Sequence, residues 1–363
     1  MIKQDIILPF YIKFTLFLIG LIALLFGFYI GRSIFIPLIF AILIAILLNP
    51  IVNFILRIKI HRTIAIILTL LIATALVGVI GTFLFAQLSK LSESWPVLVD
   101  RITLMLDEGV IWVSQHLDIN ENKANGWIQS LKHELIGYSG TAVERTILGI
   151  ANSIFMLFLV PVYVFLILLY KPLIINFIHQ LSGSRNRKKI SEIVHQTKSL
   201  VQKYLVGLVI EAIIIAILSV ATLLILGIEY ALLLGILGAL LNIIPYIGGI
   251  IGVALPMIIA LVTKDSAWFA LYILGIYYLI QLIDNNIIVP KIVASKVKIN
   301  ALFSIIIVFV GNALWGIAGM FLSIPILAIV KLIFDHIEPL KPWGFLLGDS
   351  LPDTNGFMKL KNK

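Results

Sequence analysis

Residues 231–262 decide the fold, with the sequence ALLLGILGALLNIIPYIGGIIGVALPMIIALV. The run carries no charged side chain, and its 32 residues exceed the roughly 20 that a helix needs to cross the hydrocarbon core of a bilayer. It is interrupted near its middle by Asn242, Pro245, Tyr246, Gly248 and Gly249. Proline removes a backbone donor, and glycine permits a chain reversal. We therefore expect two short apolar helices that fold back on each other as a re-entrant hairpin.

A second apolar run, residues 301–330, has the same interrupted form. The interruption comprises Gly311, Asn312 and Gly316, with Gly319 and Pro325 beyond. A shift of 70 positions places Asn242 on Asn312 and Gly249 on Gly319, as an internal repeat would, or as chance allows in a Gly- and Leu-rich sequence. Two hairpins that enter from opposite sides are the arrangement with which transporters place a site near the bilayer midplane.

The composition excludes a soluble globular protein. Of 363 residues, 61% are hydrophobic and 12% charged, and the mean hydropathy is +1.12. Outside the two interrupted runs, about six full spans are expected, at 14–30, 34–56, 64–86, 147–170, 208–226 and 268–283. Only residues 31–33 separate the first two spans, so these are expected to form a tight hairpin. The predicted fold is all-α, a polytopic membrane protein with about six full spans and two re-entrant helical hairpins.

The basic residues predict the sidedness. The net charge of +9 raises the question of a nucleic-acid partner, but the Lys and Arg residues lie between the apolar runs. Residues 57–62 carry three basic side chains and no acid, and residues 171–203 carry seven basic side chains and one acid. Such residues are retained on the cytoplasmic side. We therefore expect a multi-pass protein of the bacterial inner membrane with both termini in the cytoplasm and no nucleic-acid partner.

The spans and loops predict five segments. They are an N-terminal three-span unit (1–86), extracytoplasmic amphipathic helices (87–146), a fourth span with a basic cytoplasmic helix (147–206), a transport core with both hairpins (207–335) and a cytoplasmic tail (336–363). Apolar residues from Leu88 to Met105 follow a heptad spacing, and Pro96 after Ser94 predicts two short helices there. Their apolar face is expected on the membrane surface or in an oligomer contact. The basic helix at 190–205 is expected to lie against anionic lipid.

The sequence carries no recognisable catalytic or metal-binding motif. All six His lie in loops, helix ends or flanking segments, and Cys is absent. The common zinc-protease, serine-hydrolase and phosphate-loop motifs are also missing. We therefore expect neither an enzyme nor a bound metal or cofactor.

Few acidic or polar side chains lie at membrane depth. Glu211 is the one acid within a span, and it either snorkels to the interface or carries protons. Gln281, Asp284 and Asn285 gather where the last full span ends. They act either as helix caps and turn residues or as a polar gate or ion site. Glu211 and Asp284 are thus the candidates for proton or ion coupling.

Asn242 and Asn312 lie at the two helix breaks, where an unpaired amide is costly. Each either satisfies freed backbone groups or binds a solute. The predicted pathway for substrate or ion combines both breaks with the polar cluster: Asn242, Pro245, Tyr246, Gly248, Gly249, Gln281, Asp284, Asn285, Gly311, Asn312, Gly316, Gly319 and Pro325.

Four motifs together resemble the AI-2E family of bacterial permeases. They are PLIFA (37–41) with LLNP (47–50), NIIPYIG (242–248), the stretch from Gln281 through DNN (284–286) to PKIV (290–293), and GNALWG (311–316) followed by Gly319 and Pro325. The resemblance implies a multi-span inner-membrane protein that forms a homo-oligomer. Family members are linked to export of the furanone signal autoinducer-2 (AI-2), and some look like cation/proton antiporters. This chain departs from the family pattern at Gly249, where Pro is usual, and at Asn300-Ala301, where a His-Pro pair is usual.

These features predict a secondary transporter that exports a small polar solute, such as an AI-2-like quorum-sensing signal, by alternating access. One alternative is a monovalent cation/proton antiporter that uses Glu211 or Asp284. A second alternative is a non-transporting oligomeric scaffold in the membrane. The expected partners are membrane lipids, the solute or a monovalent cation, and further copies of the chain.

Overall fold

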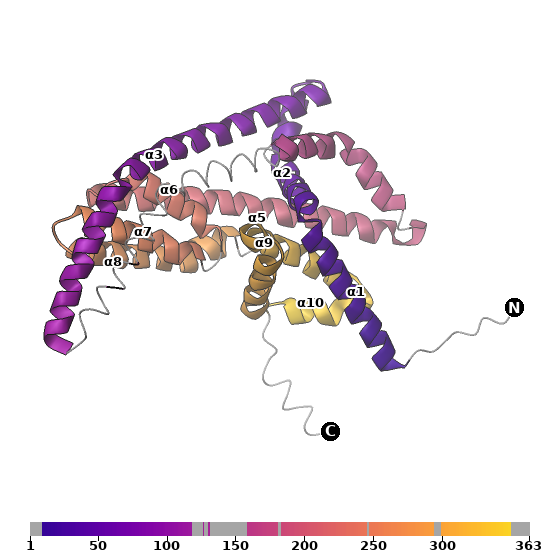
Figure 1. The fold of residues 1–363 in the computed structure, drawn as a ribbon. Coiled ribbons are helices and arrows are strands. Elements are labelled where there is room, and N and C mark those ends of the chain that lie inside the picture. Colours follow the sequence, from indigo (N-terminus) through magenta and orange to yellow (C-terminus); the bar gives the residue numbers. More distant parts are fainter. Residues whose placement is uncertain are drawn as a thin grey trace.

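The computed structural model describes residues 9–117, 126, 130, 158–180, 183–244, 247–293 and 299–349. All regular structure in these residues is helical (Figure 1), and seven of their helices are long and apolar enough to cross a membrane. The predicted class, an all-α polytopic membrane protein, is thereby confirmed.

The described helices follow one another along the chain as two groups. The first group is α1 (Phe10–Ile30), α2 (Arg32–Arg57), α3 (Arg62–Leu117), the helix Phe158–Gln180 and α5 (Gly183–Ile225). The second is α6 (Ala231–Asn242), α7 (Ile247–Thr263), α8 (Trp268–Ile283), the π-helix η1 (Asp284–Val293), α9 (Ala301–His336), the short 3₁₀-helix η3 (Glu338–Leu340) and α10 (Lys341–Leu347).

Helices α6 and α7 form the first predicted hairpin. Helix α6 ends at Asn242 and α7 begins at Ile247. Gly238 and Gly252 lie face to face across the pair, since a Cβ atom on Gly238 would lie 3.5 Å from the Cα atom of Gly252. Residues 14 positions apart touch only if the chain reverses between them. The break around NIIPYIG therefore does turn the chain back.

Helix α9 contains the second chain reversal. The Ser323 hydroxyl donates hydrogen bonds to the carbonyl oxygens of Gly319 (2.6 Å) and Ile307 (2.9 Å). Residues 307 and 323 would lie about 24 Å apart in an unbroken helix. The reversal occurs at Gly316, whose φ of 61° and ψ of −140° suit glycine alone. Gly311 and Gly319 then bring the two arms into backbone contact.

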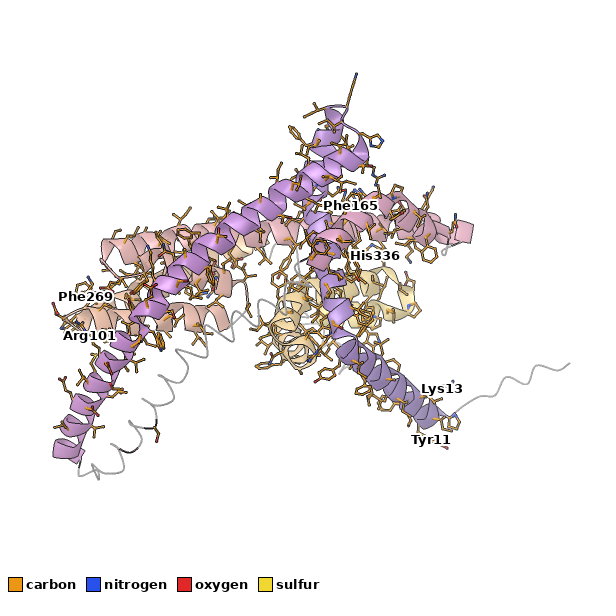
Figure 2. The ribbon with its side chains drawn as sticks, turned by 45° about the horizontal axis from the view of Figure 1, so that its top comes forward. Tyr11, Lys13, Arg101, Phe165, Phe269 and His336 are labelled. Atoms are coloured by element: carbon orange, nitrogen blue, oxygen red, sulfur yellow. The ribbon has the colours of Figure 1, made fainter. Side chains whose placement is uncertain are left out.

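The predicted hairpin between the first two spans is wrong. The Gly31 amide donates to the Gly27 carbonyl (2.9 Å), and the Phe35 amide donates to the Gly31 carbonyl (3.0 Å). The helical hydrogen-bond ladder thus passes through Gly31, and the chain bends there without reversing. Helix α1 buries none of its residues and extends away from the rest, as Tyr11 and Lys13 show in Figure 2. Because the first two spans do not fold back on each other, they need not return the N-terminus to the side of residues 57–62, and its cytoplasmic location stays a prediction.

Pro96 does not divide the segment after the third span into two helices. Helix α3 is continuous over 56 residues and bends along its length (Figure 1). The Ser94 hydroxyl donates to the Lys90 carbonyl within the helix (3.3 Å) and caps nothing. The middle of the heptad face, from Leu91 to Ile102, instead packs inside the molecule, where Leu98 is 5% exposed in a cluster with residues of α5, α6, α7 and α8, while Leu88 and Met105 at its ends are exposed. Protein, and not one of the two expected locations, covers the middle of this face.

Two further predicted breaks are absent from the structure. The basic helix and the span that follows it form the single 43-residue helix α5, and Val201, Tyr204 and Leu205 pack against α2 and α9, so protein covers this face. The predicted loop after residue 283 begins as the π-helix η1, which continues α8 and includes Pro290. Both helices persist because their faces are packed against neighbouring helices.

Candidate functional site

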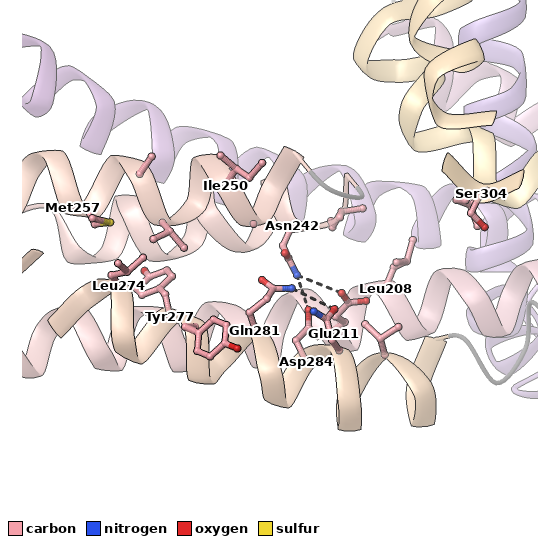
Figure 3. Close-up of a pocket in the computed structure, with 18 of the residues that line it drawn as sticks. Leu208, Glu211, Asn242, Ile250, Met257, Leu274, Tyr277, Gln281, Asp284 and Ser304 are labelled. Atoms are coloured by element: carbon pink, nitrogen blue, oxygen red, sulfur yellow. Dashed lines mark hydrogen bonds between the residues drawn. The ribbon is translucent and has the colours of Figure 1, made fainter. Parts of the chain in front are cut away.

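A cavity of about 860 Å³ lies between α5, α6, α7, α8, η1 and α9. Most of its wall is apolar and aromatic. Five polar side chains gather at one end, namely Glu211, Asn242, Gln281, Asp284 and Asn285. Figure 3 shows the first four of these pointing toward one another from α5, α6 and α8–η1.

One amide bridges two carboxylates at this end of the cavity. The Asn242 side-chain nitrogen donates to Oδ2 of Asp284 (3.0 Å) and to Oε1 of Glu211 (3.5 Å). Glu211 is 6% exposed and Asp284 is 2% exposed. Glu211, Asn242 and Asp284 thus come from three different helices and meet at one buried position. We call these three residues the Glu-Asn-Asp cluster.

Close packing of α6 on α5 brings Asn242 to Glu211. A Cβ atom on Gly235 would lie 2.8 Å from the Val220 amide nitrogen, so only glycine allows the two helices to approach this closely. Asn242 lies seven residues after Gly235, which is two helical turns and the same face. Helix α6 also ends at Asn242, so its side chain stands at a helix terminus beside the cavity.

The remaining polar groups lie at the junction of α8 and the π-helix η1. Asp284 is the first residue of η1, and Gln281 donates from its side-chain nitrogen to Oδ1 of Asn285 (3.4 Å). π-Helical segments often occur at functional sites. Gly249 of α7 faces this pair, since a Cβ atom there would lie 3.2 Å from Oε1 of Gln281.

One oxygen of the Asp284 carboxyl group lacks a donor in the described part of the chain. Among the residues that the structure describes, none donates a hydrogen bond to its Oδ1 atom. A buried acceptor without a partner is costly, so such atoms usually mark a site where another species binds. A proton or a cation at this oxygen would supply the missing partner.

The structure brings together six of the predicted site residues. The cavity is lined by Glu211, Asn242, Gly249, Gln281, Asp284 and Asn285. Glu211 points into the protein, and its burial does not fit the alternative that it snorkels to the interface. Gly248 lies behind the cavity against the backbone of Leu241 and Asn242. Pro245 and Tyr246 lie outside the described residues.

The second break does not line the cavity. Gly311, Gly319 and Pro325 are buried within the α9 hairpin, Gly316 forms its reversal, and Asn312 is exposed. Asn312 follows Gly311, whose backbone contacts the other arm, and its own side chain therefore faces a different direction. The α9 hairpin contributes Ser304 and Ile324 to the cavity wall instead.

Sequence reasoning gave no weight to the aromatic residues of the cavity. Tyr204, Tyr277 and Tyr278 line it. Helical spacing could have indicated two of them, because Tyr204 precedes Glu211 by seven residues and Tyr277 precedes Gln281 by four. Each tyrosine therefore lies on the face that carries the polar group.

The helices and the cavity with its one polar end define the general class, a polytopic helical membrane protein. The sequence model of the AI-2E family transporter matches residues 18–338, and the chain belongs to this family. The predicted resemblance is confirmed, and the chain is a permease-like transport protein.

Three relatives match over most of their length. The "AI-2 transport protein TqsA" of Escherichia coli K12 is 26% identical over 93% of this chain and 96% of its own. The "Putative transport protein YrrI" of Bacillus subtilis is 25% identical over 84% of this chain and 87% of its own. A third, the "Putative transport protein YhhT" of E. coli K12, is 23% identical over 93% of this chain and 94% of its own.

Proposed function

We propose that this protein is a secondary transporter that exports a small polar solute through the cavity at the Glu-Asn-Asp cluster. The observation that supports the proposal is the cavity itself, with about 860 Å³ of space, apolar walls and one polar end. Pockets for small molecules have volumes of about 300–1,000 Å³ and a few convergent polar groups. Because one relative is named an AI-2 transport protein, the furanone signal AI-2 is the first solute to test.

In this proposal the hairpins change their position during transport. Ser304 from the first arm of α9 and Ile324 from the second arm both line the cavity. In transporters of this kind, one helix bundle rocks against another around a fixed site. A shift of the α9 hairpin relative to α5 and α8 would open or close the cavity. With both hairpins re-entrant from opposite sides, the same shift would alternate its access.

Monovalent cation/proton antiport is a second candidate function. The Glu-Asn-Asp cluster favours it, because two buried carboxylates share one amide and Oδ1 of Asp284 lacks a donor among the described residues. A proton and a sodium ion would compete for the same oxygens. Such competition is the basic requirement for exchange of one ion for the other.

Purified protein in liposomes tests both candidates. Efflux of labelled AI-2 from preloaded vesicles measures solute transport, and an internal pH dye under an imposed sodium gradient measures antiport. We expect protein-dependent efflux of AI-2 that saturates with its concentration. Proton movement driven by sodium, without any AI-2 efflux, would replace the first candidate with the second.

The variant Asp284→Asn tests whether the cavity carries the activity. We expect a rate at least about tenfold below that of the wild type, since the cluster loses one of its two buried carboxyl groups. Asp265→Asn is the matched control, because Asp265 is exposed in the connection between α7 and α8 and does not line the cavity. Equal rates in the two variants would exclude the cavity as the pathway.

A further inference from the structure

A second, smaller cavity collects positive charge at the junction of α2, α3 and the helix Phe158–Gln180. Its volume is about 310 Å³, and its polar lining consists of Asn49, Asn53, Arg62 and Lys171. Apolar residues such as Val52 and Leu168 complete the wall. Among the described residues, no carboxylate lines this cavity. We call it the basic pocket.

Neutral acceptors hold the two cations in place. The Lys171 ammonium donates to Oδ1 of Asn49 (2.7 Å), and Asn49 is 5% exposed. The Arg62 guanidinium donates to the Leu168 carbonyl (2.6 Å). An ammonium has three donors and a guanidinium has five, so these bonds orient the two groups and leave further donors for a ligand.

The positive charges of the basic pocket have no counter-charge among the described residues. The charged groups that act on Lys171 are Lys198 of α5 and Arg62, and both are positive. Two ion pairs in the described part of the chain, Lys331 with Asp335 and Lys341 with Glu338, lie away from the pocket. Like charges brought together at partial burial repel one another. The arrangement becomes favourable when an anion occupies the pocket.

The position of the pocket indicates which anion fits. It lies between α2 and the helix Phe158–Gln180, and both helices are long and apolar enough to cross a membrane. Their faces turned away from the pocket expose large apolar side chains, with Ile51 at 47%, Phe54 at 63% and Leu173 at 65%. In a membrane protein such faces lie against lipid chains. A basic pocket between membrane helices suits a phosphate head group whose acyl chains lie along those helices.

We propose that the basic pocket binds the phosphate of an anionic phospholipid. Asn49, Arg62 and Lys171 hold the head group, and the acyl chains lie along the apolar helices that flank the pocket. This site is separate from the transport cavity and does not depend on the identity of the transported solute.

Native mass spectrometry of the purified wild-type protein tests the lipid. The lipids are dioleoylphosphatidylglycerol and dioleoylphosphatidylcholine, which have the same chains and differ in head-group charge. We expect the first lipid to be retained on the protein at least about tenfold more strongly, since each basic residue near an anionic lipid contributes about a fivefold gain. Equal retention of the two lipids would overturn the proposal.

Paired variants locate the site. The double variant Arg62→Gln with Lys171→Gln removes two charges from the pocket, and we expect it to lose most of the preference for phosphatidylglycerol. The control Lys189→Gln with Lys203→Gln removes two charges from exposed positions on α5 that do not line the pocket. It should keep the preference. A loss in the control that matches the loss in the pocket variant would contradict a defined site.

Soluble competitors distinguish a lipid from a free anion. Inorganic phosphate and glycerol 3-phosphate carry the head-group chemistry without acyl chains. We expect neither to displace bound phosphatidylglycerol at millimolar concentration. Displacement by inorganic phosphate would assign the pocket to a soluble anion and overturn the lipid proposal. Should the double variant fail to fold, these wild-type measurements decide the question without it.

Discussion

At the residue scale, Asn242 is the link between the two buried acids. Its amide nitrogen donates to both Glu211 and Asp284, which come from different helices. Leucine has nearly the same size as asparagine but offers no donor. The exchange Asn242→Leu therefore removes the bridge without opening a large cavity.

We expect Asn242→Leu to lower the initial rate of transport at least about tenfold, because two buried carboxyl groups lose the amide donor that Asn242 supplies to both. The control is Asn312→Leu, the same exchange at an exposed position outside the cavity, and its rate should stay within about twofold of the wild type. Both rates are measured in liposomes with equal protein content. A similar loss in both variants would mean that the two asparagines act alike, contrary to the structure.

The sequence identifies the acids of the cavity but not the direction in which they point. Around Glu211, α5 is apolar on all sides, with Ile210, Ala212 and Ile213 as its neighbours. An amphipathic stripe, which would tell the protein face from the lipid face, is therefore absent. The inward orientation of Glu211 follows from the close packing of α6 at Gly235, which becomes evident only in three dimensions.

At the scale of the elements, the sequence predicted the two chain reversals correctly and several other breaks wrongly. Several glycines and a polar side chain occur together at each reversal, in residues 242–249 and 311–319. These residues allow a non-helical backbone conformation over several positions. Pro96, Pro290 and Gly31 are isolated signals. A proline in a helix removes one backbone N–H donor. Around Pro96 the packing of the side chains outweighs this loss, because Trp95 and Leu98 contact the core.

Gly316 carries the reversal of α9, and we expect Gly316→Ala to destabilise the protein by about 1–3 kcal/mol because its backbone conformation suits glycine alone. The measurement is the thermal unfolding temperature in detergent. Gly275→Ala is the control, since Gly275 lies in α8 with no heavy atom within 4 Å of an added Cβ, and helix propensity favours alanine there. If Gly316→Ala unfolds at or above the temperature of the control, the reversal does not need glycine.

At the scale of the whole molecule, the placement of the hairpins in the bilayer is still a prediction. The chain contains no Cys, so single Cys reporters can be introduced without background. Glu229 precedes the α6–α7 hairpin, Ser266 follows it, and Ser191 lies on the basic part of α5. All but Ser266 are exposed, and Ser266 is partly exposed.

We expect an impermeant thiol reagent to label Glu229→Cys and Ser266→Cys in intact cells, and Ser191→Cys only after permeabilisation. The first two should share a side because a re-entrant hairpin returns to the side from which it enters, whereas the apolar part of α5 crosses the bilayer between Ser191 and Glu229. Labelling of Glu229→Cys and Ser266→Cys from opposite sides would show that α6 and α7 together cross the membrane.

The continuity of α5 has a mechanical consequence. Lys198, beside the basic pocket, and Glu211, in the Glu-Asn-Asp cluster, belong to one uninterrupted helix and lie 13 residues apart, about 20 Å along its axis. A helix without a break tilts as one body, so a contact that fixes α5 at Lys198 also restrains its movement at Glu211. If a ligand in the basic pocket changes the affinity of the cavity at the Glu-Asn-Asp cluster, thermodynamic reciprocity requires that occupancy of the cavity change the affinity of the pocket by the same factor.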